Sequence, residues 1–192
     1  MRHKENKKKQ ALLSIFIAII MVSSILGYML GRDEPDSVNY GKYKFYPKNF
    51  LWATKIQSKE YEFNNLPTSV ENINISKGIF VRIKGTLEVD STYDENSSFS
   101  QEMALTQHEL SLLLKSYTNI YLRNGLTKKN SYNLPVITCE DATDLIPVLY
   151  FKIANETQIY QDGNCIMVEA RNGAEFLRIK DRIAFGILGI IE

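Results

Sequence analysis

Two cysteines, Cys139 and Cys165, carry the most definite chemistry in this chain of 192 residues. Both lie in the C-terminal half, beside segments that read as strands. In a small domain outside the cytoplasm, an isolated pair is most simply a structural disulfide, and closing a loop of about 27 residues stabilises a fold by about 3.5 kcal/mol. The alternative is a reactive thiol at Cys139, but the chain has no Cys-x-x-Cys pair to form a redox site. We therefore expect the bridge.

Residues suited to metal binding or acid–base catalysis are sparse. His108 stands alone in a predicted helix, and Leu112 occupies the i+4 position where a second ligand would be needed. His108 could activate Cys139 only if the fold joined them, and a disulfide would abolish that pair. The acidic residues Asp90, Asp94 and Glu95 are better explained as a solvated loop than as a calcium-binding loop. Glu140, Asp141 and Asp144 are better explained as helix caps than as an acid–base pair.

No sequence motif in the chain indicates a particular enzymatic reaction. It contains no Gly-x-Ser-x-Gly, no phosphate loop and no Gly-x-Gly-x-x-Gly. We therefore predict no catalytic residue, no metal and no cofactor. Three Asn-x-Ser/Thr triplets are candidate glycosylation sites, at Asn74, Asn96 and Asn155, although chance also produces such triplets in a chain rich in asparagine.

An uncharged run over positions 11–30 predicts the cellular location of these residues. It reads ALLSIFIAIIMVSSILGYML and follows a basic tail. Twenty helical residues rise about 30 Å, the thickness of a bilayer's hydrocarbon core, and the excess of basic residues before the run predicts a cytoplasmic N-terminus. The sequence thus predicts a basic cytoplasmic tail at 1–10, a transmembrane helix in contact with lipid at 11–31, a linker at 32–41 and an extracytoplasmic globular domain at 42–192.

The alternative for this run is a cleaved signal peptide, but the chain lacks a good Ala-x-Ala-like cleavage site. Three small residues recur every four positions on one face of the run, as in helices that associate within a bilayer: Ser23, Gly27 and Gly31. They favour a homodimer through this helix, although small residues are common in such helices in any case.

Charge argues against nucleic acid as a partner. The whole chain has a net charge of +1, and its first nine residues carry five basic and one acidic side chain. The rest therefore has a net charge of −3, which gives no electrostatic reason to bind nucleic acid. Its hydrophobic content of 44% is typical of a folded domain.

The pattern after the linker predicts an α+β or α/β fold with helices packed on one mixed sheet. Residues 43–63 read as a strand and a hairpin, broken at Pro47. A capping box at Ser98 predicts a helix to about residue 117, and Asp162-Gly163-Asn164 predicts a hairpin between strands at 157–161 and 165–170. Short strands at 86–90, 119–122 and 148–153 complete the sheet. The order is similar to a thioredoxin-like core, with Pro147 before an antiparallel strand.

The last predicted helix, over 175–191, is apolar on all sides after Asp181-Arg182. A helix of this kind is usually buried in a core. The alternative is that its end, over 185–191, docks on a partner or returns to the bilayer surface; about eight residues are too few to cross a bilayer. The partner-contact candidates are Trp52, Phe185, Leu188, Arg178 and Arg182.

The C-terminal pattern also resembles a family. Pro135-Val-Ile-Thr-Cys139-Glu-Asp-Ala-Thr, Pro147-Val-Leu-Tyr-Phe, Gly163-Asn-Cys165-Ile and Asp181-Arg-Ile-Ala-Phe-Gly-Ile-Leu-Gly-Ile are similar to uncharacterised single-pass membrane proteins of small archaea. The resemblance implies that both cysteines belong to one shared architecture, and it implies no activity.

These observations lead to one functional expectation and one alternative. We expect a membrane-anchored envelope protein whose extracytoplasmic domain binds or scaffolds a partner protein without catalysis. The alternative is an extracytoplasmic, thiol-dependent, thioredoxin-like protein that uses Cys139. Free, acidic thiols would favour the alternative, and a stable bridge would favour the binding protein.

Overall fold

The computed structural model describes residues 2–30 and 37–191, with side chains described at 12–27 and from 37 onward. The chain forms two compact units, residues 1–37 and Val38–Glu192. The globular unit thus begins four residues earlier than the expected 42, because β1 (Val38–Tyr40) takes up the end of the expected linker.

The first unit contains helix α1 (Arg2–Leu30). Within the described part of the chain, no helix is long and apolar enough to cross a membrane. The prediction of a transmembrane helix at 11–31 is therefore wrong. In α1 the side chains described at 12–27 are all exposed. Of its small residues, Ser23 donates a hydrogen bond to the Ile19 carbonyl (2.7 Å), and Gly31 lies outside the described residues.

The second unit is α+β, but it contains two sheets where one was expected. The first is an antiparallel meander in the order β1-β2-β3-β4, with β2 (Tyr43–Lys48), β3 (Leu51–Ile56) and β4 (Lys59–Phe63). Pro47 does not break β2. It lies opposite Trp52 of β3, and the pairing of β2 with β1 covers only Tyr43 to Phe45, so Pro47 lies beyond it. Two-residue turns with positive φ at both residues, Asn49-Phe50 and Gln57-Ser58, connect the longer strands.

The second sheet has the order β5-β9-β10-β8-β6-β7. Its strands are β5 (Asn74–Ile75), β6 (Glu88–Tyr93), β7 (Tyr121–Asn124), β8 (Val148–Ile153), β9 (Gln158–Asp162) and β10 (Cys165–Ala170). The expected hairpin is present as β9 and β10. The strand β8 after Pro147 is parallel to both of its neighbours, β6 and β10. The expected thioredoxin-like order, with an antiparallel strand at this position, is therefore wrong.

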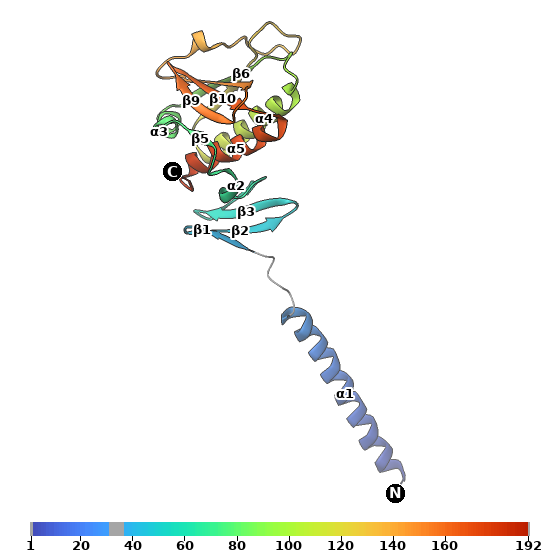
Figure 1. The fold of residues 1–192 in the computed structure, drawn as a ribbon. Helices are drawn as coiled ribbons and strands as arrows, with labels where there is room; N and C mark the ends of the chain where they lie inside the picture. The colour runs from blue at the N-terminus through green and yellow to red at the C-terminus, as the bar shows by residue number, and fades with distance from the viewer. Residues whose placement is uncertain (1, 31–36, 192) are drawn as a thin grey trace. The chain divides into compact units, whose positions relative to one another are not determined.

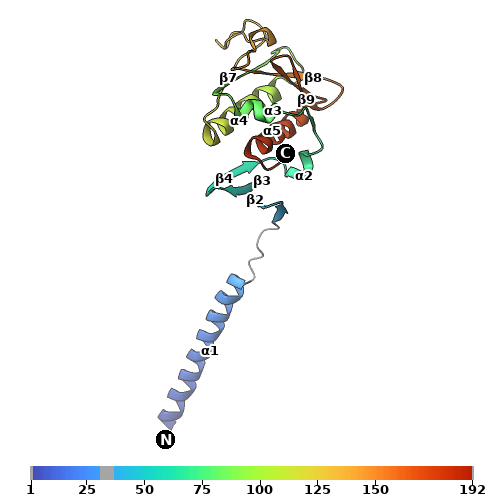
Figure 2. The same cartoon turned by 90° about the vertical axis from the view of Figure 1, so that its left-hand side faces the viewer.

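Helices fill the space between the two sheets (Figures 1 and 2). They are α2 (Pro67–Val70), α3 (Ile79–Lys84), α4 (Ser100–Tyr117) and α5 (Gly173–Leu188). α4 begins at Ser100 with Phe99 as its N-cap residue and no side-chain cap, so the predicted start at Ser98 is wrong. Glu140 and Asp141, which we expected to be helix caps, lie in a 3-10 turn (Cys139–Asp141), whose capping box joins Thr138 and Asp141.

Helix α5 forms the centre of the core. Its Phe176 packs against Phe151 of the six-stranded sheet, and its Phe185 packs against Phe45 and Phe63 of the four-stranded sheet. Contact with both sheets explains why its C-terminal half is apolar on all sides. Gly186 fits this packing closely, since a Cβ there would lie 2.2 Å from the Phe80 ring of α3.

Candidate functional site

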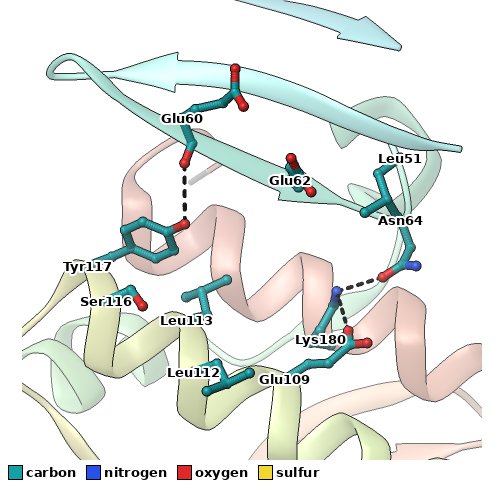
Figure 3. A pocket seen from close by; sticks show the side chains of 10 residues that line it. All are labelled: Leu51, Glu60, Glu62, Asn64, Glu109, Leu112, Leu113, Ser116, Tyr117 and Lys180. Atoms are coloured by element: carbon teal, nitrogen blue, oxygen red, sulfur yellow. Dashed lines mark hydrogen bonds and ion pairs between the residues drawn. The ribbon is translucent and has the colours of Figure 1, made fainter. Parts of the chain in front are cut away.

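A hollow of about 410 Å³ lies between β4 and α4, with Lys180 of α5 at its wall. Figure 3 shows the residues that line it. From the four-stranded sheet and the segment after it come Leu51, Glu60, Glu62 and Asn64, and from the helices come Glu109, Leu112, Leu113, Ser116, Tyr117 and Lys180. We call this hollow the β4 groove. It combines three carboxylates with an apolar helix face.

The backbone of β4 faces the groove because β4 is the last strand of its sheet. In an antiparallel pair, alternate residues turn their N–H and C=O groups away from the neighbouring strand. The Tyr117 hydroxyl donates to the Glu60 carbonyl across the groove (3.4 Å), so Glu60 is one of the residues whose backbone turns outward. Glu62, two residues on, has the same orientation. The groove therefore contains an edge at which another strand can pair.

The side chains of Glu60 and Glu62 lie on the face of β4 opposite the core, because Tyr61 and Phe63 between them point inward. The ammonium group of Lys48 lies between both carboxylates, at 2.8 Å from Glu62 Oε1 and in closer contact with Glu60. Hydrogen bonds from Lys48 and from the Tyr46 hydroxyl hold the pKa of Glu60 below its usual value. Glu60 thus stays ionised at neutral pH, and about a third of each glutamate side chain is exposed.

At the other end of the groove, the buried Lys180 ammonium has three oxygen partners. They are Asn64 Oδ1 at 2.7 Å, Glu109 Oε2 at 2.8 Å and Asp181 Oδ1 at 2.9 Å. Burial alone would lower the pKa of Lys180, but the charge of Asp181 and the hydrogen bonds with Glu109 and Asp181 raise it above its usual value. Lys180 therefore remains an ammonium and joins the end of β4 to α4 and α5.

The wall that α4 contributes is mostly apolar. Leu113 is nearly buried, Leu112 is half exposed, and the Tyr117 ring stacks on Tyr61 with centroids 3.9 Å apart. Three carboxylates, those of Glu60, Glu62 and Glu109, and one ammonium group, that of Lys180, line the groove and give the lining a net charge of −2. Lys48 and Lys55, on strands β2 and β3, offset part of this charge. Among the described residues, no cluster of His, Cys, Asp or Glu could hold a metal ion. The groove is therefore suited to binding a cationic, partly apolar group.

A second hollow, of about 560 Å³, lies on the other side of α4, against the edge strand β7. Leu112 borders both hollows. Arg123 lines this one, but Asp90 already accepts two hydrogen bonds from its guanidinium, at 2.6 and 2.7 Å. Lys115 also lines this hollow, which therefore contains cations and no carboxylate, in contrast to the β4 groove.

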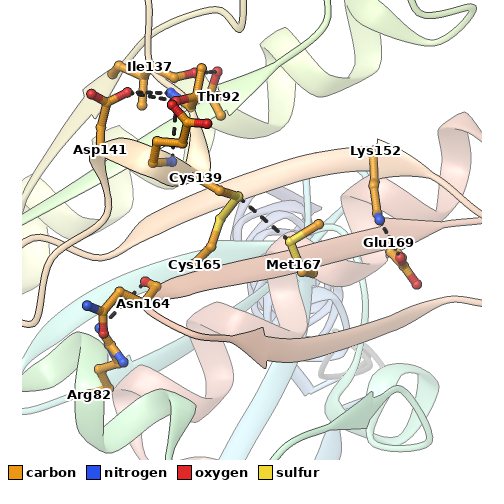
Figure 4. Close-up of a disulfide and its surroundings, with 12 residues drawn as sticks. Arg82, Thr92, Ile137, Cys139, Asp141, Lys152, Asn164, Cys165, Met167 and Glu169 are labelled. Carbon is orange, nitrogen blue, oxygen red and sulfur yellow. Dashed lines mark hydrogen bonds and ion pairs between the residues drawn. A yellow bond between two sulfur atoms is a disulfide. The ribbon is translucent and has the colours of Figure 1, made fainter.

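The predicted disulfide between Cys139 and Cys165 is confirmed, with Cα atoms 5.2 Å apart. It joins the segment before β8 to the first residue of β10, and Cys139 Sγ lies 3.9 Å from Met167 Sδ (Figure 4). Ile137, Val148, Cys165 and Met167 form a small core there, on the sheet face away from the helices. A thiol reaction at Cys139 would have to begin with reduction of this bond.

The other candidate residues lie apart from the groove. The side chains of Asn74, Asn96 and Asn155 are exposed, as glycan attachment requires. His108 is exposed on α4, and Asp94 pairs with Lys128 at 2.8 Å.

Of the partner-contact candidates, Phe185 and Arg182 are buried in the core region, whereas Trp52, Leu188 and Arg178 are partly buried. Arg178 is held by Glu175, Ser69 and Asn72.

The residues of the β4 groove were absent from the sequence predictions. One signal was available, because the alternation in Lys59-Glu60-Tyr61-Glu62-Phe63 places two carboxylates on one face of a strand. The ion pair between Glu109 and Lys180 could not be predicted from a local sequence pattern, because 71 residues separate the two side chains.

Comparison of the chain with protein-family models, curated proteins and solved structures finds no match. The resemblance to archaeal membrane proteins therefore stays a prediction, and the function has to be argued from the groove itself.

Proposed function

We propose that the globular domain is a non-catalytic protein-binding module that takes up an extended segment of a partner, by strand addition, in the β4 groove. The observation that carries this proposal is the open edge of β4 beside an apolar helix face. Main-chain hydrogen bonds to a sheet edge supply affinity, and side-chain pockets next to the edge supply specificity. Here Glu60 and Glu62 offer the backbone groups, and Leu113 and Tyr117 offer apolar contacts. The Glu60 carbonyl already accepts a long hydrogen bond from the Tyr117 hydroxyl, at 3.4 Å, which an added strand shares or replaces.

The disulfide supports a location outside the cytoplasm, because structural disulfides form and persist in oxidising compartments. We therefore include an extracytoplasmic location in the proposal. The thiol-dependent alternative is not favoured, since both cysteines are used in a bridge that joins two parts of the fold.

The test uses a phage-displayed library of random heptapeptides, selected on the purified protein, with hydrogen exchange on the complexes that result. Strand addition predicts that bound peptides slow exchange of the Glu60 and Glu62 amides. Copies of the peptides with alternate backbone nitrogens methylated should bind at least tenfold more weakly, because they cannot donate to the edge.

Two variants separate backbone pairing from charge. Glu62→Pro removes the outward N–H, whereas Glu62→Gln removes the same charge and keeps the N–H. We expect Glu62→Pro to lose binding well beyond Glu62→Gln. Selected peptides that bind equally well when methylated, and that leave both amides unprotected, would overturn strand addition even if Glu62→Pro failed to fold. Failure to select any peptide would also count against the proposal.

A further inference from the structure

We infer that the segment recognised in the β4 groove is basic, with Lys or Arg at alternate positions and apolar residues between them. This inference rests on the proposed function and specifies its partner. The net charge of −2 on the residues that line the groove is the first reason. Charge complementarity of this kind selects partners and speeds their association.

The spacing follows from strand geometry. Side chains of an added strand alternate between the two faces of the sheet, and those opposite a β4 residue have Cβ atoms about 4.5–5.5 Å from it. On the outer face they therefore meet Glu60 and Glu62. On the inner face they turn toward α4, where Leu112, Leu113 and Tyr117 are apolar. Cations two residues apart, with an apolar residue between, satisfy both faces.

The carboxylates retain the capacity to accept such cations. An ionised carboxylate has about four acceptor sites. Lys48 is 2.8 Å from Oε1 of Glu62, and Lys180 is 2.8 Å from Oε2 of Glu109. About a third of the side chain of each of these two glutamates, Glu62 and Glu109, is exposed. An incoming Lys or Arg can thus add to the existing pairs without displacing them.

The same charges reject the opposite ligand. An acidic segment would bring its carboxylates next to Glu60 and Glu62, on the face where Lys48 already pairs with both glutamates and Lys55 lies opposite Glu60. Like charges placed directly opposite each other in a sheet are destabilising. Charges on an edge strand also discourage uncontrolled pairing, so the acidity of β4 both protects this edge and restricts it to basic strands.

The experiment compares three heptapeptides with blocked ends, each with Val at the even positions and Lys, Thr or Glu at the odd positions. Affinities are measured by fluorescence anisotropy at low and moderate salt. We expect the Lys peptide to bind at least tenfold more tightly than the Glu peptide, with the Thr peptide between them. The advantage of the Lys peptide should shrink as salt rises, because these charges are exposed.

The matched variants are the double substitutions Glu60→Gln/Glu62→Gln, in the groove, and Glu140→Gln/Glu156→Gln, at exposed carboxylates elsewhere. Both remove two negative charges. We expect the groove variant to weaken the Lys peptide about tenfold and the control to leave it within twofold. Equal losses in both variants would show that net charge alone attracts the peptide, and would overturn the inference.

Hydrogen exchange on the same complexes tests the preference for a basic segment separately from strand addition. If the Thr or Glu peptide binds as tightly as the Lys peptide and protects the Glu60 and Glu62 amides, strand addition stands and the basic preference is wrong. If the Lys peptide binds without protecting those amides, the charge preference stands and strand addition is wrong. If no peptide binds, both are wrong.

Discussion

At the scale of single residues, Lys180 connects the groove to the stability of the fold. Its side chain is 5% exposed, and its ammonium group lies 2.9 Å from Asp181, whose side chain is fully buried. Asp181 is held on its other oxygen by the backbone and side-chain amides of Asn65, at 2.7 and 2.9 Å. A buried ion pair of this kind adds little net stability when complete, but removing one partner leaves an uncompensated buried charge.

The substitution Lys180→Met is expected to lower the free energy of unfolding by about 3–5 kcal/mol, because it leaves Asp181 buried without its cation. Urea denaturation followed by circular dichroism measures the loss. Lys128→Met is the matched control, since Lys128 makes a salt bridge of similar length, 2.8 Å, to Asp94 while its side chain is 62% exposed. That variant should lose less than about 1 kcal/mol. A loss of similar size in both variants would contradict the role assigned to Lys180.

At the scale of secondary structure elements, the outer face of the six-stranded sheet contains the buried carboxylate of Glu169. Glu169 of β10 is paired in register with Lys152 of β8 and Gln158 of β9. It accepts hydrogen bonds from Gln158 (2.7 Å) and Tyr160 (2.9 Å), and Lys152 lies at 2.9 Å. Burial alone would raise the pKa of Glu169, but these three donors together hold it below its usual value. The carboxylate thus ties three strands together in its ionised form.

This environment predicts a specific dependence of stability on pH. A carboxyl group whose folded pKa is depressed contributes stability that is present above its unfolded pKa, about 4.3, and is lost as pH falls through the folded value. Glu169→Gln should therefore lower the free energy of unfolding by about 1.5 kcal/mol at pH 7. The gap between wild type and variant should close as the pH falls below about 4.3.

Denaturation curves of both proteins between pH 7 and pH 2.5 measure that gap. Glu156→Gln, at an exposed carboxylate after β8, serves as the control and should show a difference of less than about 0.5 kcal/mol at every pH. A gap for Glu169→Gln that stays constant across the range would mean that its ionisation does not contribute to folding.

Elements with a local signal were predictable from the sequence, and contacts between distant elements were not. The alternation around Asp162-Gly163-Asn164 and the continuous apolar strand β8 predicted their elements correctly. The four-stranded meander was recognised only as a strand and a hairpin, because Pro47 reads as a strand breaker. Only the tertiary pairing shows that β1 pairs with Tyr43 to Phe45 and that Pro47 lies opposite Trp52 of β3. The start of α4 was displaced because Ser98 satisfies a capping pattern that the chain does not use.

At the scale of the whole molecule, the disulfide secures the long segment between β7 and β8. This segment covers one face of the six-stranded sheet and has little regular structure of its own. Its backbone makes a few hydrogen bonds, such as those from the Leu126 amide to Pro135 and from the Ile137 amide to Leu126. The Thr92 hydroxyl also donates to the Ile137 carbonyl, at 2.7 Å. The bridge at Cys139 adds a covalent attachment to β10 two residues later.

The double substitution Cys139→Ala/Cys165→Ala is therefore expected to lower the free energy of unfolding by about 3.5 kcal/mol, through the entropy that the unfolded chain regains. The loss should also have a local component. Amides of the covering segment, Leu126 and Ile137 above all, should exchange much faster than in wild type, whereas Leu110 and Leu114, buried on α4, should exchange only through global unfolding. Hydrogen exchange under native conditions separates the two components. Faster exchange confined to the segment would show that the bridge secures this cover on a sheet that remains folded without it. Equal acceleration at every amide would show instead that the bridge acts only on global stability.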